Sequence, residues 1–138
     1  MEEPKLAITG MNHFTVLTTD LDKSKAFYVS LLGLTEGYRP PFEFPGAWLY
    51  CGDQAILHIM AGRPIPTTIH GIIDHIAFSA CNLQSVIDRL NQHNIAYTLN
   101  RLKGLESWQL FCADPDGAKV ELDFTASEPE PQNIKQTK

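Results

Sequence analysis

The chain has 138 residues, of which 43% are hydrophobic and 20% are charged, as is usual for one globular domain with an adequate core. Its net charge of −5 and the lack of a stripe rich in lysine and arginine argue against nucleic-acid binding. No apolar run approaches the roughly 20 residues that cross a bilayer, and the first residues include no apolar signal region, so we expect a cytoplasmic protein without membrane contact.

The folded part is predicted to run from residue 8 to residue 125 as a single domain. Residues 1–7 are interpreted as a short N-terminal extension. The last segment, 126–138, is polar, contains proline and is poor in large apolar residues, so we predict a disordered tail.

The first elements of the domain form one structural unit. A strand is predicted within residues 11–19, which are rich in β-branched and aromatic residues. Asp20 is expected to cap a helix through its side-chain oxygen, and this helix ends before Gly33. Three further strands are predicted at residues 36–39, 47–51 and 54–60.

The second half of the domain repeats this order. A strand is predicted within residues 73–80, Asn82 is expected to cap a second helix, and Asn94 takes the place of the glycine. The last three strands are predicted at residues 96–101, 108–113 and 118–124. The fold class is therefore α+β, with two tandem βαβββ modules at about 8–62 and 70–125.

The repeat aligns four side chains that can bind metal ions. His13 falls on His75 at an offset of 62 positions, and His58 falls on Glu121 at an offset of 63. Because strand residues alternate between faces, each first-strand histidine lies on the less bulky face, opposite the apolar face that packs on the helix. If the two sheets curve toward each other, all four side chains converge.

A divalent metal ion explains this composition. Imidazoles and a carboxylate are suitable ligands for Fe, Mn, Ni, Co or Zn. A carboxylate buried in a sheet is costly without a partner, and a bound cation removes that cost. We therefore predict that His13, His75 and Glu121 bind one divalent ion, with His58 either a fourth ligand or a hydrogen-bond donor to the other ligands.

Four further residues are predicted to bind a small-molecule substrate. Arg39 and Trp48 lie in an aromatic, proline-rich segment that can form the wall of a pocket. Arg101 aligns with Arg39 at the offset of 62, and either arginine could hold an oxyanion in a bidentate pair. Gln109 begins a strand of module two and is expected to face the cavity. The alternative for each arginine is a solvated surface position.

The segments MNHFTVLTTDLDKSKAFYVSLLGL, DHIAFSACNLQSVIDRL and DPDGAKVELDF resemble the vicinal-oxygen-chelate superfamily of glyoxalases, bleomycin-resistance proteins and extradiol dioxygenases. The resemblance extends from Met11 to Phe124. It implies a cupped, barrel-like mixed sheet around the metal, with the helices packed outside. It also implies a homodimer, in which the four ligands come either from one chain or from both.

The resemblance leaves three functions open. The first is a glyoxalase-like lyase or isomerase, in which Glu121 is the catalytic residue that moves a proton within a small oxygenated metabolite. The second is an extradiol-type dioxygenase that cleaves a ring. The third is a binding protein for a drug such as bleomycin or fosfomycin, which gives resistance without catalysis.

Overall fold

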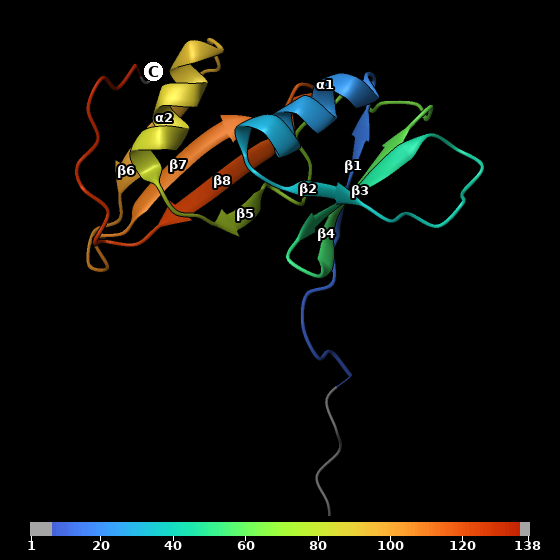
Figure 1. Cartoon of the computed structure of the whole chain (residues 1–138), viewed down its shortest axis with the longest axis horizontal. Helices are drawn as coiled ribbons and strands as arrows, with labels where there is room; N and C mark the ends of the chain where they lie inside the picture. The colour runs from blue at the N-terminus through green and yellow to red at the C-terminus, as the bar shows by residue number, and fades with distance from the viewer. Residues whose placement is uncertain (1–6, 136–138) are drawn as a thin grey trace, which may run out of the picture.

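The computed structural model describes residues 7–135, which form two four-stranded mixed sheets with helices packed on them. Figure 1 shows the sheets side by side, with α1 above the region where they meet. The order of the strands is β1-β4-β3-β2 in one sheet and β5-β8-β7-β6 in the other. The predicted pair of tandem βαβββ modules is confirmed.

The elements follow the predicted sequence with small shifts at their ends. Module one contains β1 (Phe14–Thr18), α1 (Leu21–Lys25), the π-helical η1 (Ala26–Leu31), β2 (Thr35–Gly37), β3 (Gly46–Cys51) and β4 (Gln54–Ala61). Module two contains β5 (Ile76–Ser79), α2 (Leu83–Gln92), β6 (Tyr97–Arg101), β7 (Trp108–Ala113) and β8 (Lys119–Phe124). No helix within residues 7–135 is long and apolar enough to cross a membrane.

The strand register confirms the internal repeat. In module one β1 runs parallel to β4, and Thr15 lies opposite His58. In module two β5 runs parallel to β8, and Ala77 lies opposite Glu121. The residue two positions after each first-strand histidine therefore faces the second predicted ligand of its own module.

The two helices begin in different ways. The Asp20 side chain accepts a hydrogen bond from the backbone N–H of Lys23, as predicted for a cap of α1. Asn82 instead has a left-handed backbone (φ 64°), and its side chain makes no capping hydrogen bond among the described residues, so that prediction is wrong. The Glu128 carboxylate takes its place, because it accepts from the backbone N–H groups of Asn82 and Leu83 at 3.1 and 2.9 Å.

The prediction of a disordered tail is wrong for residues 126–135, which run along α2 as the red segment in Figure 1. Gln84 on α2 both donates to the carbonyl of Gln132 and accepts from its N–H. Asn91 donates to the carbonyl of Asn133. Polar side chains of the helix thus hold a segment that offers few apolar groups. Residues 136–138 of the predicted tail, and residues 1–6 of the predicted extension, lie outside the described part.

The turn between β7 and β8 joins the two modules. Asp114 in this turn is buried and accepts a hydrogen bond from the hydroxyl of Tyr28 on η1 at 2.7 Å. Asp116 accepts from the hydroxyls of Thr18 and Thr19, both at 2.6 Å. The buried apolar side chains of both modules also form one continuous core. The modules therefore hold a defined arrangement within the chain.

Candidate metal centre

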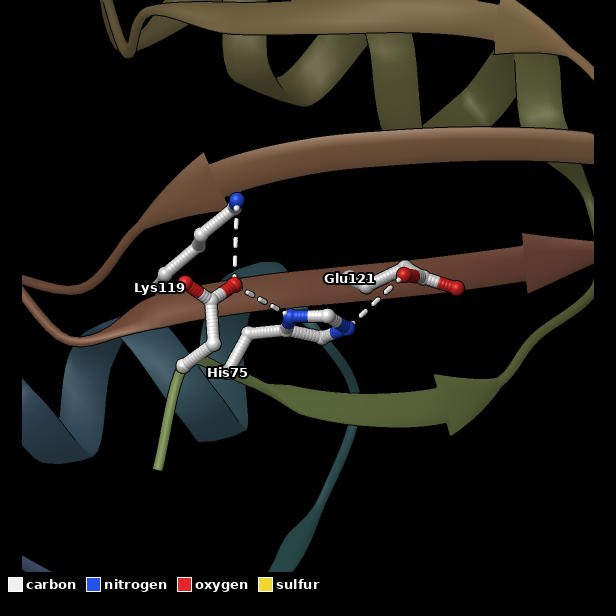
Figure 2. Close-up of polar contacts among 4 residues, drawn as sticks. His75, Lys119 and Glu121 are labelled. Carbon is white, nitrogen blue, oxygen red and sulfur yellow. Dashed lines mark hydrogen bonds and ion pairs between the residues drawn. The ribbon is translucent and has the colours of Figure 1, made fainter. Parts of the chain in front are cut away.

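His75 lies one residue before β5, between two carboxylates (Figure 2). Its Nδ1 donates to Oδ2 of Asp74 at 2.7 Å, and its Nε2 lies 3.1 Å from Oε1 of Glu121. A neutral imidazole with its proton on Nδ1 has a lone pair on Nε2. Two acceptor atoms therefore face each other across 3.1 Å, which requires a shared positive charge: a proton or a metal ion.

This spacing fits a metal ion. Imidazole nitrogens and carboxylate oxygens bind zinc at about 2.1 Å, so two neighbouring ligand atoms lie about 3.0–3.4 Å apart in octahedral or tetrahedral geometry. The observed distance of 3.1 Å between Nε2 of His75 and Oε1 of Glu121 falls within that range. Module two thus presents its two predicted ligands at a suitable distance from each other.

Glu121 is buried at 6% exposure, whereas the neighbouring Asp123 is half-buried. Burial raises the pKa of the Glu121 carboxyl, and a hydrogen bond with Asp123 and the negative charge of Asp123 raise it further. His75 and Gln109 act in the opposite direction. Gln109 thus interacts with Glu121 and lies on the face of the sheet that carries it.

Lys119 lies beside the Asp74 carboxylate that accepts the hydrogen bond from His75. Its ammonium lies 3.3 Å from Oδ2 of Asp74 and 5.0 Å from the ring centre of Phe111. The hydrogen bond from His75, followed by that from Lys119, holds the pKa of Asp74 below its usual value. Asp74 therefore stays ionised and fixes the Nδ1 tautomer of His75.

In module one the first histidine is held in the same way. His13 lies one residue before β1, and its Nδ1 donates to Oδ1 of Asn12 at 2.7 Å. Asn12 and Asp74 are equivalent positions of the repeat, at the offset of 62. Both first-strand histidines therefore bond through Nδ1 to the preceding side chain, which leaves Nε2 for a ligand.

His58, the second predicted ligand of module one, has a different pose. The ring of His58 is stacked between His13, at 3.7 Å between centroids, and Trp48, at 3.9 Å. Its Nε2 lies 3.2 Å from the carbonyl of Ala55, to which it donates. Burial, followed by the electrostatic effect of the neighbouring His13, lowers the pKa of His58 and favours the neutral form that binds metals. The ring must turn before Nε2 can bind an ion.

The structure brings the four predicted ligands together as two pairs. His13 contacts His58 on one sheet, and His75 contacts Glu121 on the other. Within residues 7–135, no three side chains of the metal-binding types gather at one point. Each module of a single chain therefore carries half of the predicted ligand set.

The predicted substrate residues differ in their placement. Arg39 and Trp48 line a pocket together with His58. Arg101 pairs with Trp108, which in turn pairs with the buried Phe124, so Arg101 lies on the face away from Glu121. Its guanidinium donates to the carbonyls of two surface segments and covers the Trp108 ring. Arg101 has no part in the site proposed below.

Comparison with known proteins identifies the family. The family model of the glyoxalase/bleomycin resistance protein/dioxygenase superfamily matches residues 10–122, which is most of the chain. The chain belongs to this superfamily. The match includes both modules and all four predicted ligands.

Relatives within the superfamily carry several names. The chain is 32% identical over 125 residues to Glyoxylase I 4 of Arabidopsis thaliana, across 85% of this chain and 71% of the relative. It is 31% identical over 118 residues to Glutathione transferase FosA of Serratia marcescens, across 83% and 80%. A crystal structure of a glyoxalase family protein from Bacillus anthracis matches 88% of this chain and 99% of that protein, with a TM-score of 0.73 and 21% identity.

Sequence reasoning missed two residues of this superfamily member, Asn12 and Asp74. Both immediately precede an aligned histidine, so their position in the repeat was a usable signal. An asparagine and an aspartate at one aligned position share an acceptor oxygen, which is what an Nδ1–H group requires.

Proposed function

We propose that the protein is an enzyme that uses a divalent metal ion and catalyses a glyoxalase-like lyase or isomerase reaction on a small oxygenated metabolite. The observation that carries the proposal is the contact between His75 and Glu121, whose facing acceptor atoms require a cation or a proton between them. His13, from the aligned position of module one, completes the set of three ligands. His58 joins it if its ring turns away from Trp48.

The two half-sites are proposed to combine across a homodimer. Thr15 and Ala77, which flank the ligands on the site faces of the two sheets, are exposed in the single chain. The linker between the modules also exposes three isoleucines, Ile69, Ile72 and Ile73, at 57%, 102% and 72%. A cluster of exposed apolar side chains marks a surface for a protein partner. A twofold dimer would place module one of each chain against module two of the other.

Glu121 is proposed to move the proton. Its Oε1 faces His75, and its carboxylate is proposed to accept a proton from a substrate carbon and return it to a neighbouring atom. Burial, which raises the pKa of this carboxyl, brings its proton affinity closer to that of a useful base at neutral pH. A bound divalent ion would supply Lewis acidity for the adjacent oxygens of the substrate.

Elemental analysis tests the metal site. Protein purified without chelators is expected to retain about one divalent ion per chain, because a twofold dimer has two equivalent sites. His75→Ala and Glu121→Ala are expected to lose it. His93→Ala is the matched control. This exposed histidine at the end of α2 donates to the carbonyl of Arg89 and is not one of the four predicted ligands. A metal-free wild type, or full retention by both site variants, would contradict the proposal.

Turnover assays test the reaction. The metal-loaded protein is expected to isomerise hemithioacetals of 2-oxoaldehydes, and Glu121→Gln is expected to lose at least about a hundredfold in kcat. Oxygen uptake on catechols measures the dioxygenase alternative in the same preparations. Activity on catechols without activity on hemithioacetals would replace the lyase assignment with ring cleavage.

A second candidate is the addition of glutathione to a small electrophile. It is favoured by the relative from Serratia marcescens, which is named a glutathione transferase and is nearly as similar as the Arabidopsis thaliana protein. Consumption of glutathione thiol in the presence of fosfomycin measures this activity. Binding of fosfomycin without thiol consumption would instead indicate a resistance protein that sequesters the drug.

A further inference from the structure

A small pocket opens beside the histidine pair of module one. Its volume is about 160 Å³, and its walls include Arg39, Phe42, Phe44, Trp48 and His58. Whole ligand sites usually measure about 300–1,000 Å³. This pocket therefore has room for one compact group of a substrate, such as a single ring or a short chain.

Arg39 is held rigidly in this pocket. Its guanidinium donates to the carbonyl of Phe44 at 2.8 Å and lies 5.0 Å from the ring centres of both Phe42 and Phe44. Gly46 allows this position, because a Cβ atom there would lie 2.9 Å from Nη2 of Arg39 and 2.3 Å from the carbonyl oxygen of Ile59. Fixing the plane of a guanidinium reduces the entropy lost when it forms paired hydrogen bonds.

The charge around the pocket favours an anion. Arg63 also lies over the ring of Phe44, at 5.0 Å, so two guanidinium groups flank one aromatic side chain. This is a local concentration of positive charge in a chain of net charge −5. Glu43 is the carboxylate of the same segment, and it is exposed to solvent. Most N–H donors of Arg39 are left over after its bond to Phe44, and their planar fork matches a carboxylate.

We propose that Arg39 and the surrounding aromatic rings form a subsite for the carboxylate of a compact organic acid. The body of the acid lies against Trp48 and Phe42, whose rings are 6.2 Å apart, and its reactive end extends toward His58. The inference rests on the proposed function for the reaction at that end, but the subsite itself requires no metal. The substrate class is thereby narrowed to small carboxylic acids with a planar or apolar body.

Binding of benzoate and benzamide to the chelated, metal-free protein tests the subsite. The two probes have nearly the same shape and differ in charge. Benzoate is expected to bind at least about tenfold more tightly than benzamide, because only the carboxylate forms charge-assisted hydrogen bonds with Arg39. Equal binding of the two probes, or no binding of benzoate, would overturn the proposal. Tighter binding of phenylphosphonate than of benzoate would overturn the assignment to a carboxylate.

Variants identify the residues that carry the preference. Arg39→Met is expected to lose the preference for benzoate, and Arg39→Lys, which keeps the charge without the fork, is expected to retain part of it. Arg101→Met is the matched control. Arg101 aligns with Arg39 in the repeat, but it lies on the face of its sheet that is opposite to Glu121. An unchanged preference in Arg39→Met, or an equal loss in Arg101→Met, would contradict the assignment.

Metal content separates this proposal from the metal site. Arg39→Met is expected to retain as much metal as the wild type, since Arg39 is not among the four ligands. If the wild type binds benzoate and benzamide equally but retains its metal, the subsite is wrong and the proposed metal enzyme stands. If the wild type holds no metal but prefers benzoate, the subsite stands without the proposed reaction.

Discussion

At the scale of single residues, the side chain before each first-strand histidine determines which ring nitrogen is free. Asn12 and Asp74 both accept from Nδ1 at 2.7 Å, in modules that share few identical residues. The two acceptors differ in charge. A carboxylate increases the electron density of the imidazole more than an amide does, so His75 is expected to be the stronger ligand of the two histidines.

Replacement of Asp74 is therefore expected to weaken metal binding without removing a ligand. Asp74→Ala should lower metal affinity about 10- to 100-fold, and Asp74→Asn should lower it less, because the amide oxygen still accepts from Nδ1. Titration calorimetry with Zn²⁺ measures the affinity. Nitrogen-15 NMR of the metal-free protein measures the tautomer of His75, which should become mixed only in Asp74→Ala. Asp22→Ala, at an exposed site in α1, is the control. Unaltered affinity and tautomer in Asp74→Ala would contradict this role.

At the scale of elements, the turn between β7 and β8 connects two modules as well as two strands. Asp116 accepts hydrogen bonds from Thr18, from both the N–H and the hydroxyl of Thr19, and, at 3.4 Å, from Ser24. Burial acts to raise the pKa of this carboxyl, but the hydrogen bonds outweigh it and lower the pKa below its ordinary value. The contact therefore depends on the ionised form.

The stability that Asp116 contributes should depend on pH. A group whose pKa is lower in the folded protein stabilises it above the unfolded value, about 3.9, and this contribution is lost as the pH falls through the folded value. Asp116→Asn is expected to lower the free energy of unfolding by about 1–3 kcal/mol at pH 7. Urea denaturation should show this difference shrinking below about pH 4. Asp53→Asn, at the aligned exposed position in module one, should have little effect. A difference independent of pH would show that charge is not the cause.

Glu128 is a cap supplied from outside the helix that it stabilises. Its two oxygens accept from the first backbone N–H groups of α2, where a negative charge is also favoured by the helix dipole. Glu128→Ala is expected to lower stability by about 1 kcal/mol and to speed hydrogen exchange at the amide of Leu83. Glu130→Ala, at an exposed position in the same segment, should change neither quantity. Normal exchange at Leu83 in Glu128→Ala would contradict the capping role.

The order of the elements could be predicted from the sequence because apolar alternation and the internal repeat are local patterns. The tail and the cap of α2 could not, since they depend on side chains far apart in the chain, such as Gln84 with Gln132. The alignment of Arg101 with Arg39 did not predict where the Arg101 side chain lies. Arg101 lies within β6, whereas Arg39 lies beyond the end of β2, so side chains at aligned positions of the repeat need not point the same way.

At the scale of the whole molecule, the fold explains why one chain carries two proposed half-sites. The turn containing Asp114 and Asp116 bonds to η1 and to the end of β1, which fixes the modules side by side. Fixed in this way, the pair His13 and His58 remains on one sheet and the pair His75 and Glu121 on the other. A second chain is the proposed source of the other half, and the exposed linker isoleucines offer a surface for it.

Mixing two inactive variants tests this shared site directly. In His13→Ala and in His75→Ala alone, every site of a dimer lacks one ligand. In a mixed dimer, one site lacks both ligands, while the other combines an intact module one with an intact module two. Random exchange makes about half of the dimers mixed, so the mixture should recover about a quarter of wild-type metal content and activity. A site built within one chain would recover nothing, because every chain in the mixture carries a defect. His75→Ala mixed with Glu121→Ala is the negative control, because both defects lie in module two and no mixed dimer regains an intact site.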